Sequence, residues 1–275
     1  MFPILNKELL APAIYRLRVR APLIAQRARA GNFVILRLDE TSERIPITIA
    51  GHDPRAGTLD LVIQAVGKST EDLCSLKPGA ALRDVLGPLG EAVEVRGEKN
   101  VIGICGGIGA APILPVLKAY HAQGARITTI FGARSADLFV LKEELRAISD
   151  QLIYTTDDGS LGRRGLVTEP LEELLQRGQI FDRAVAIGPA PMMRAVCKVT
   201  EKYALPTIVS LNAIMIDGTG MCGGCRVTVA GETKFTCVEG PCFDGHRVDF
   251  DSLILRQAFY RQQEQEAVQT RGAER

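Results

Sequence analysis

Three cysteines close together in a glycine-rich segment are the residues of this chain best suited to bind a metal. Cys222 and Cys225 form a C-x-x-C pair, and Cys237 follows after eleven intervening residues. A plant-type [2Fe–2S] loop has the spacing C-x₄-C-x₂-C, followed by a distant fourth cysteine. In this chain Asp217 occupies the first position of that spacing. The segment therefore predicts either an iron–sulfur site with a carboxylate ligand or a metal site of another kind.

The competing interpretation is a zinc site with four thiolate ligands. It uses Cys242 instead of Asp217 and has the spacing C-x₂-C-x₁₁-C-x₄-C. The spacing D-x₄-C-x₂-C and the glycines between the ligands, which allow tight wrapping of the backbone, favour the iron–sulfur site. Three thiols buried without a metal are the least favoured alternative. The preferred ligand set is Asp217, Cys222, Cys225 and Cys237.

The second candidate site is the glycine-rich segment 103–115, which reads GICGGIGAAPILP. It lies between an expected strand (100–105) and an expected helix (about 110–123). Dinucleotide phosphates bind in this context, because glycines allow close approach and the helix N-terminus presents N–H donors. Pro112 stands where the G-x-G-x-x-G pattern has its last glycine. The run of glycines favours nucleotide binding over a tight turn without a ligand.

Residues 67–70 read GKST and resemble the end of a Walker A phosphate loop. That loop needs a glycine where Val62 stands, so ATP chemistry is not expected. The turn precedes an expected helix (70–76) and could hold a different pyrophosphate, although a simple helix cap explains it equally well. On their own, residues 43–50 (ERIPITIA) are typical of a strand with a charged edge.

The pattern of strands and helices that must position these residues indicates an α+β chain of several domains. Residues 1–97 contain short strands and Pro/Gly turns, which predict an antiparallel β-barrel. Residues 98–205 alternate strands with helices, including a helix over 138–149, and predict a parallel sheet between helical layers. The cysteine-rich residues 206–250 form a separate subdomain, followed by a helix and polar tail over 251–275.

Composition narrows the class of protein. Among the 275 residues, 46% are hydrophobic and 24% charged, which predicts folded cores. A net charge of +1 gives no electrostatic reason to expect nucleic acid or an anionic membrane as a partner. The N-terminus lacks the features of a signal peptide, and no apolar run is long enough to span a membrane. Seven cysteines, an odd number with three of them clustered, indicate metal ligation in a reducing compartment, so we expect a cytoplasmic protein.

The order of barrel, nucleotide domain and cysteine loop resembles the ferredoxin–NADP⁺ reductase superfamily, in the branch of the dihydroorotate dehydrogenase electron-transfer subunits. It is most similar to the small subunits of NADH-dependent ferredoxin:NADP⁺ oxidoreductases, also known as sulfide dehydrogenase beta subunits. The resemblance covers nearly the whole chain. It rests on the segments ERIPITIAG, VGKSTEDL, GPLG, GGIGAAP, FGARS, AIGPAPMM and MIDGTGMCGGCR with its later cysteine. In these small subunits the first ligand is an aspartate, which implies that Asp217 is a native ligand.

The resemblance also implies roles for individual residues. The FAD-binding segment matches Arg44, Pro46 and Thr48, with the arginine one place early and without the aromatic residue of the superfamily's Arg-x-Tyr-Ser pattern. The turn that binds the FAD pyrophosphate matches Gly67, Lys68, Ser69 and Thr70. The nicotinamide-nucleotide site matches Gly107, Gly109 and Pro112 in its loop, Arg134 and Ser135 near the ribose, and Gly188 and Pro189 at another strand end. Ile187 stands where many members have a cysteine, so no catalytic residue is assigned.

The function implied is that of an oxidoreductase subunit that passes electrons between NAD(H), FAD and a [2Fe–2S] cluster. A larger partner subunit with FAD and [4Fe–4S] clusters is expected to form a heterodimer or higher assembly with it, to bifurcate electrons and to serve ferredoxin. NADP(H) stays open as the nucleotide, because Arg134 could pair with a 2′-phosphate. The alternatives are a reductase for dihydroorotate, sulfide or polysulfide enzymes, and a zinc-containing nucleotide-binding interaction module.

Overall fold

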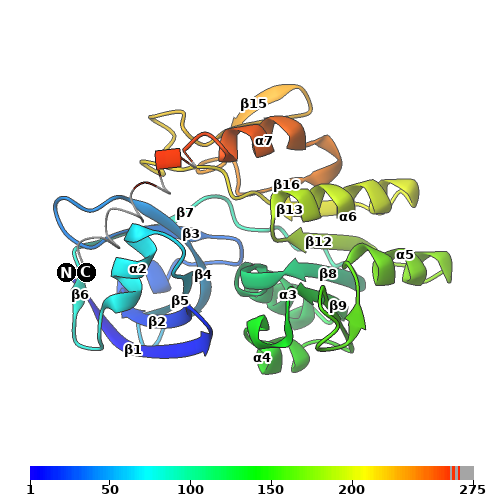
Figure 1. Cartoon of the computed structure of the whole chain (residues 1–275), viewed down its shortest axis with the longest axis horizontal. Coiled ribbons are helices and arrows are strands. Elements are labelled where there is room, and N and C mark those ends of the chain that lie inside the picture. The colour runs from blue at the N-terminus through cyan, green and yellow to red at the C-terminus, as the bar shows by residue number, and fades with distance from the viewer. Residues whose placement is uncertain (261, 264–265, 267–275) are drawn as a thin grey trace.

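The N-terminal part of the chain forms an antiparallel sheet that curls into a barrel (Figure 1, left). The computed structural model describes residues 1–260, 262–263 and 266. The strand order is β6-β1-β2-β5-β4-β3-β7. The elements are β1 (Phe2–Ala11), β2 (Ile14–Arg20), α1 (Pro22–Ala25), β3 (Phe33–Arg37), β4 (Ile45–Asp53), β5 (Thr58–Gln64), α2 (Lys68–Ser75), β6 (Ala81–Leu82) and β7 (Asp84–Leu89). The predicted antiparallel barrel is confirmed.

Alternation of side chains along the strands explains this barrel. In β2, Leu17 and Val19 are fully buried in the barrel core. Arg18, between them, faces outward and pairs with Asp60, which lies directly opposite on β5, at 2.7 Å. Successive side chains of a strand point to opposite faces, so the apolar set fills the interior and the charged set stays in water.

The middle of the chain forms a mostly parallel sheet with the order β11-β10-β9-β8-β12-β13-β16. Its first elements are β8 (Asn100–Gly106), the 3₁₀ turn η1 (Gly107–Gly109), α3 (Ala110–Ala122), β9 (Arg126–Ala133), the 3₁₀ turn η2 (Ala136–Leu138) and α4 (Lys142–Arg146). They continue as β10 (Gln151–Thr156), β11 (Arg163–Arg164), α5 (Thr168–Gln176), β12 (Arg183–Ile187), α6 (Ala190–Lys202) and β13 (Thr207–Ser210). This confirms the predicted parallel nucleotide-domain sheet.

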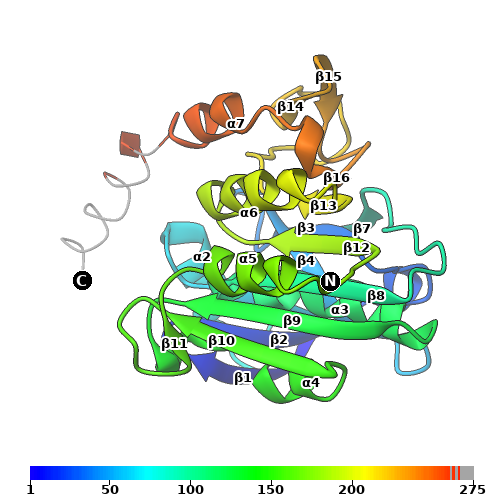
Figure 2. The same cartoon turned by 90° about the vertical axis from the view of Figure 1, so that its right-hand side faces the viewer.

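Helices cover both faces of this sheet. Ile102 and Ile104 of β8 pack in the core beneath α5 and α6, whereas Val101 and Cys105 of the same strand pack in the core beneath α3 and α4. Figure 2 shows α6 and α4 on opposite sides of the strands. A strand buried on both faces must be apolar throughout, which explains the sequence VIGIC.

The sheet continues beyond residue 205, where the sequence placed a domain boundary. β13 lies parallel to β12, and β16 (Cys242–Asp244) pairs with β13 in the antiparallel sense. Two strands of the cysteine-rich region therefore complete the sheet of the nucleotide domain. The predicted boundary stays a prediction, but the backbone hydrogen bonds do not separate the two regions at that point.

The helix expected over 138–149 is wrong in its first part. Residues before 142 form the η2 turn and an extended segment, and Leu141 has φ +55°, outside the helical region. Phe139 is buried against Phe131, with ring centroids 4.6 Å apart in an edge-to-face arrangement. Burial of this aromatic residue overrides the local helical pattern, so only α4 is helical.

The C-terminal region lies over both the barrel and the parallel sheet, in yellow to orange at the top of Figure 1. It contains the hairpin of β14 (Arg226–Val229) and β15 (Glu232–Phe235), the turn η3 (Gly245–Arg247) and α7 (Phe250–Gln257). The predicted polar tail falls largely on residues 261, 264–265 and 267–275, which lie outside the described residues. No helix in the described part of the chain is long and apolar enough to cross a membrane.

Candidate functional site

The cysteine loop brings together two of its three thiols. Cys225 and Cys237 are each 2% exposed, and their sulfur atoms lie 3.2 Å apart. Thr236 donates its hydroxyl to the Cys225 carbonyl at 2.8 Å, which holds the β14–β15 hairpin against the loop. Cys222 is exposed, and its sulfur accepts the Gly224 N–H at 3.4 Å. The loop thus has a buried thiol pair and one thiol at the surface.

Asp217 organises the other end of the loop. Its Oδ1 accepts the Thr219 N–H and its Oδ2 accepts the Cys222 N–H, both at 2.9 Å. The Thr219 N–H, and after it the Cys222 N–H, lowers the pKa of the Asp217 carboxyl. Gly218 and Gly220, with φ +76° and +85°, let the chain double back so that a carboxylate and the backbone of a cysteine five positions later meet.

No three His, Cys, Asp or Glu side chains among the described residues are grouped so that they could hold a metal ion. The chemistry of the donor set nevertheless fits an iron–sulfur cluster. Burial, and then the contact with Cys225, raises the pKa of the Cys237 thiol, and a bound metal cation favours the thiolate form of such a ligand. The backbone N–H groups of Cys222, Gly224 and Cys237 already point at ligand atoms, as hydrogen-bond donors around such clusters do.

Cys242, which the zinc interpretation requires, belongs to a different part of the fold. It lies in β16, directly opposite Ser210 of β13. It lines a cavity of about 470 Å³ together with Arg183, His246 and residues 91–94 and 96. Burial raises the pKa of its thiol to about 11. Its place in the sheet edge therefore favours Asp217 as the fourth ligand.

The glycine-rich nucleotide loop meets the end of β12 very closely. A Cβ on Gly109 would lie 2.3 Å from the Ile187 carbonyl oxygen and 3.1 Å from Gly188 Cα. The fold thus brings Gly106 and Gly109 of the loop beside Gly188 and Pro189, which lie far away in the sequence. Gly107 has φ +55°, and a Cβ there would meet nothing within 4 Å. A tight turn with open space in front of it fits the approach of a pyrophosphate.

Helix α3 begins directly after this turn. No side chain caps its N-terminus, so its first N–H groups have no side-chain acceptor. Pro112 sits in the first turn, where its missing N–H removes no helical hydrogen bond. Arg134 and Ser135 follow β9 at the same edge of the sheet, and Ser135 donates its hydroxyl to Asp137 at 2.5 Å. All of these positions lie at the carboxyl ends of parallel strands.

The two expected FAD segments are joined by a side-chain contact. Ser69 of α2 donates its hydroxyl to Glu43, next to the exposed Arg44. Pro46 and Thr48 lie on β4, opposite Ile35 and Phe33 of β3.

The GKST turn has the geometry of a helix cap with open space around it. Thr70 Oγ1 accepts the N–H groups of Val66 and Gly67 at 3.1 Å, and it donates to the Gly67 carbonyl at 3.0 Å. A Cβ on Gly67 would meet nothing within 4 Å, and Lys68 is exposed. The open space fits a phosphate group beside the turn.

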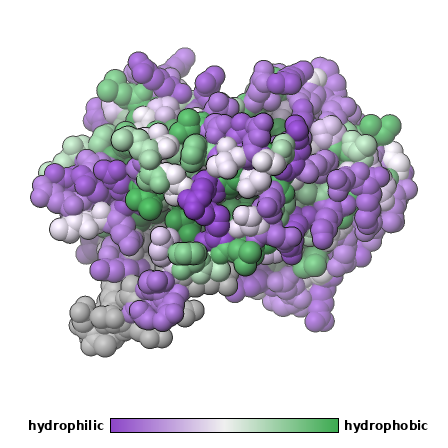
Figure 3. Space-filling model, turned by 90° about the horizontal axis from the view of Figure 1, so that it is seen from above, coloured by the Kyte–Doolittle hydropathy of each residue, from purple (hydrophilic) through white to green (hydrophobic). Residues whose placement is uncertain are grey.

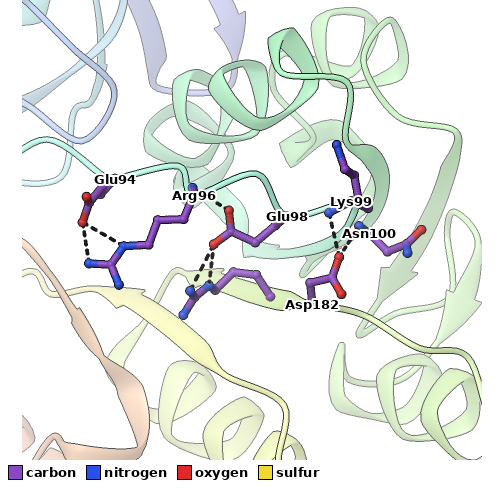
Figure 4. A network of polar contacts seen from close by, with 7 residues as sticks. Glu94, Arg96, Glu98, Lys99, Asn100 and Asp182 are labelled. Atoms are coloured by element: carbon purple, nitrogen blue, oxygen red, sulfur yellow. Dashed lines mark hydrogen bonds and ion pairs between the residues drawn. The ribbon is translucent and has the colours of Figure 1, made fainter.

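Two features of the fold were not found from the sequence. One is the burial of both faces of β3, a strand that the sequence does predict, whose residues FVILR include four buried in succession. The other is the polar network at the start of the parallel sheet (Figure 4). Arg183 donates to Glu98 at 3.0 Å, and Asp182 accepts the N–H groups of Lys99 and Asn100 at 2.6 and 2.9 Å. The run of four apolar residues was a usable signal for this double burial, whereas the network depends on residues distant in sequence.

Comparisons with known proteins match the same regions. Residues 104–198 match the oxidoreductase NAD-binding domain family, and residues 212–249 match the iron–sulfur cluster binding domain of dihydroorotate dehydrogenase B. An uncharacterized protein of Clostridium beijerinckii is 43% identical, over 97% of this chain and 93% of its own. A homologue of the dihydroorotate dehydrogenase B (NAD⁺) electron-transfer subunit from Thermotoga maritima is also 43% identical, over 95% and 92%.

A solved structure matches the whole fold. A chain from the NADH-dependent reduced ferredoxin-NADP oxidoreductase structure, described with flavin-based electron bifurcation, superposes with a TM-score of 0.93. It is 41% identical, and the match covers 98% of this chain and 97% of that one.

Proposed function

The chain belongs to the family of dihydroorotate dehydrogenase B electron-transfer subunits and their homologues, within the ferredoxin–NADP⁺ reductase superfamily, and we propose that it relays electrons from NAD(H) to a larger redox partner. It does so as an oxidoreductase subunit with FAD and a [2Fe–2S] cluster as cofactors. The observation that carries this proposal is the placement of the loop with Asp217 and the three cysteines against the barrel strand beside Pro46 and Thr48.

The nucleotide site orients its ligand and performs no acid–base chemistry. The N-terminus of α3 and the Gly107–Gly109 turn hold the pyrophosphate through backbone N–H groups. Gly188 and Pro189, at the end of β12, bound the neighbouring space, and Arg134 with Ser135 contacts the ribose. A hydride transfer needs stacking and orientation and little proton transfer.

The barrel holds the flavin between its two segments. Thr48 and Pro46 of β4 face the ring system, while Arg44 and the Gly67–Thr70 turn bind the phosphates. The hydrogen bond from Ser69 to Glu43 keeps these segments together. When bound, the flavin converts a two-electron transfer into single-electron transfers and the cluster passes single electrons onward.

The cluster ligands are Asp217, Cys222, Cys225 and Cys237. Asp217 differs from a thiolate because its oxygen is a harder donor that shares less electron density with iron. The exposed Cys222 places one side of the site at the molecular surface, next to Met221, which is 89% exposed. A cluster at the surface can pass its electron to another subunit.

The partner is a larger subunit with FAD and [4Fe–4S] clusters, and the joint activity is flavin-based electron bifurcation with ferredoxin and NADP⁺. Exposed apolar side chains accompany the cysteine loop, namely Ile216, Met221 and Val238. Figure 3 looks down on the side that carries the C-terminal region, where hydrophobic patches interrupt the hydrophilic surface. Such patches are typical of surfaces that bind another protein.

A second candidate function is electron transfer to a dihydroorotate dehydrogenase, because several relatives bear that name. The first ligand position separates the two candidates, since the resemblance implies a cysteine there in the dihydroorotate branch and an aspartate in the bifurcating one. Asp217 therefore favours the bifurcating assembly.

Electron paramagnetic resonance of the anaerobically purified, dithionite-reduced protein tests the cluster assignment. We expect a rhombic [2Fe–2S] signal in the wild type that keeps its shape in Cys242→Ala and changes in Asp217→Cys. A wild type that gives no signal and contains one zinc per chain contradicts the proposal and supports the interaction module. A signal lost in Cys242→Ala but unchanged in Asp217→Cys assigns the fourth ligand to Cys242 instead.

A further inference from the structure

Strand β3 belongs to two cores at once. Val34 and Leu36 are fully buried in the barrel core. Phe33 and Ile35, each 3% exposed, instead pack in the core that contains Cys225 and Cys237. Successive side chains point to opposite faces, so this strand is a wall with the barrel interior on one side and the cysteine region on the other.

The same strand is hydrogen-bonded to the segment expected to hold the flavin. Ile35 lies directly opposite Pro46 of β4, and Phe33 lies opposite Thr48. Neighbouring strands are about 4.8 Å apart. One strand therefore connects the proposed flavin segment to the proposed cluster loop.

The loop touches this wall at Gly218, next to the ligand Asp217. A Cβ on Gly218 would lie 2.6 Å from Ile35 Cγ1, closer than carbon atoms approach, and 3.1 Å from Leu89 Cδ1, which is a tight contact. A second contact joins the barrel to the cysteine-rich region. The Glu91 N–H, just after β7, donates to the Gly240 carbonyl, just before β16, at 2.6 Å. The loop rests on the barrel with no space for an additional methyl group at Gly218.

We propose that Ile35 and Gly218 are positioning residues that set the separation between the flavin and the cluster. This inference rests on the proposed function, and it adds to that function the two residues that set the distance between flavin and cluster. Electron transfer through protein slows steeply with distance, so a packed contact beside a ligand fixes the rate as well as the structure. Close-packed interiors transmit a small change of volume directly to their neighbours.

The contact itself is tested by hydrogen–deuterium exchange on the full chain as purified, comparing Ile35→Ala with Leu36→Ala. These variants lose the same number of carbon atoms from adjacent positions of one strand, but Leu36 faces the barrel core. We expect faster exchange of the Thr219 and Cys222 amides in Ile35→Ala and no change there in Leu36→Ala. Equal exchange at these amides in both variants overturns the contact, whatever the electron-transfer activity is.

The consequence is tested by the rate at which NADH-reduced flavin reduces the cluster, in stopped-flow absorbance. Ile35→Ala should slow this step several-fold, with unchanged cluster content, paramagnetic resonance spectrum and midpoint potentials. Leu36→Ala should keep the wild-type rate. A normal rate in Ile35→Ala overturns the proposal. If NADH reduces neither cofactor in the wild type, it is the proposed function that fails, and the exchange experiment still decides the contact.

Gly218→Ala approaches the same contact from the loop. It should slow electron transfer or reduce cluster content, and adding Ile35→Ala should restore part of the loss because it removes the atoms that clash. Gly231→Ala is the control, because Gly231 has a similar φ of +81° but a Cβ there meets nothing within 4 Å. A loss in Gly231→Ala equal to that in Gly218→Ala, or no restoration in the double variant, attributes the effect to backbone strain and rejects the contact.

Discussion

Asp217 and Thr70 each accept two backbone N–H groups of their own loops. At the scale of the residue, these side chains therefore shape the loop as well as offer contacts to a cofactor. The loops take their form from hydrogen bonds within the chain, so a ligand meets a prepared surface and less conformational entropy is lost on binding. A substitution at such a position should affect stability and ligand retention together.

Thr70→Val tests this double role, because it keeps the shape of the side chain and removes its hydroxyl. We expect a loss of about 0.5–2 kcal/mol in the free energy of unfolding, as for other helix caps, and a lower flavin-to-protein ratio after gel filtration. Ser75→Ala removes another hydroxyl from α2, one that donates to the Asp72 carbonyl of the same helix, and should keep the flavin. Full flavin retention in Thr70→Val would contradict the assignment of the GKST turn to the flavin site.

At this scale, motifs whose residues lie close together in the sequence can be predicted. The spacing from Asp217 to Cys225 and the motif at Gly107–Gly109 are local, so their chemistry could be predicted, although their roles as ligands stay predictions. The contact between Ile35 and Gly218 could not be predicted, because it depends on how two distant segments fold against each other.

At the scale of the element, α3 and the end of β12 form one unit through Gly109. The absence of a Cβ lets the helix N-terminus approach the Ile187 carbonyl. The two strand ends that carry the expected nucleotide residues are joined there.

Gly109→Ala should separate the helix from the strand end. We expect a loss of about 1–3 kcal/mol from overpacking, together with weaker NADH binding, measured by thermal denaturation and fluorescence titration. Gly124→Ala, in the turn after α3, meets the strain of φ +82° in open space and should weaken the fold without changing NADH affinity. NADH affinity that falls equally in both variants would show that general destabilisation is the cause.

Apolar periodicity is sufficient to predict most elements of the parallel sheet, since buried strands and amphipathic helices carry strong patterns. It failed where tertiary packing determines the length of a helix or the pairing of a strand. Leu141 with its positive φ shortens the expected helix, and β16 joins the sheet from beyond the expected boundary. Pairing partners of a strand are a property of the folded chain, and no local pattern encodes them.

At the scale of the whole molecule, ion pairs join segments that are distant in the sequence. Arg16 of the barrel donates to Glu144 of α4 at 2.9 Å. Glu98, at the start of the parallel sheet, accepts from Arg183 at 3.0 Å. Burial alone would raise the pKa of Glu98, but the backbone N–H groups of Glu98 and Arg96 and the Arg183 guanidinium outweigh it and lower the pKa.

Glu98→Gln should reduce the free energy of unfolding by about 1–3 kcal/mol at neutral pH. A carboxyl whose pKa is lowered in the folded state stabilises the fold above its unfolded pKa and loses this effect as the pH falls through the folded pKa. The difference between wild type and variant should therefore shrink below about pH 4, as denaturant titrations at several pH values would show. Glu94→Gln, in an exposed pair with Arg96, should change stability by less than about 0.5 kcal/mol. A difference for Glu98→Gln that is independent of pH would contradict the role of its charge.

The shared wall of β3 and the shared sheet of β13 and β16 limit how this chain can be divided. A fragment that ends near residue 205 would expose the outer face of β3 and leave β12 as a sheet edge, so it should aggregate instead of acting as a free flavin reductase. If the cysteine region is replaced by that of a relative, the new loop must carry a glycine at the position of Gly218. The residue at position 35 must then be taken from the same relative, because these two positions pack against each other. Because regions that follow one another in sequence share a core and a sheet here, we expect calorimetry to record their melting as a single transition.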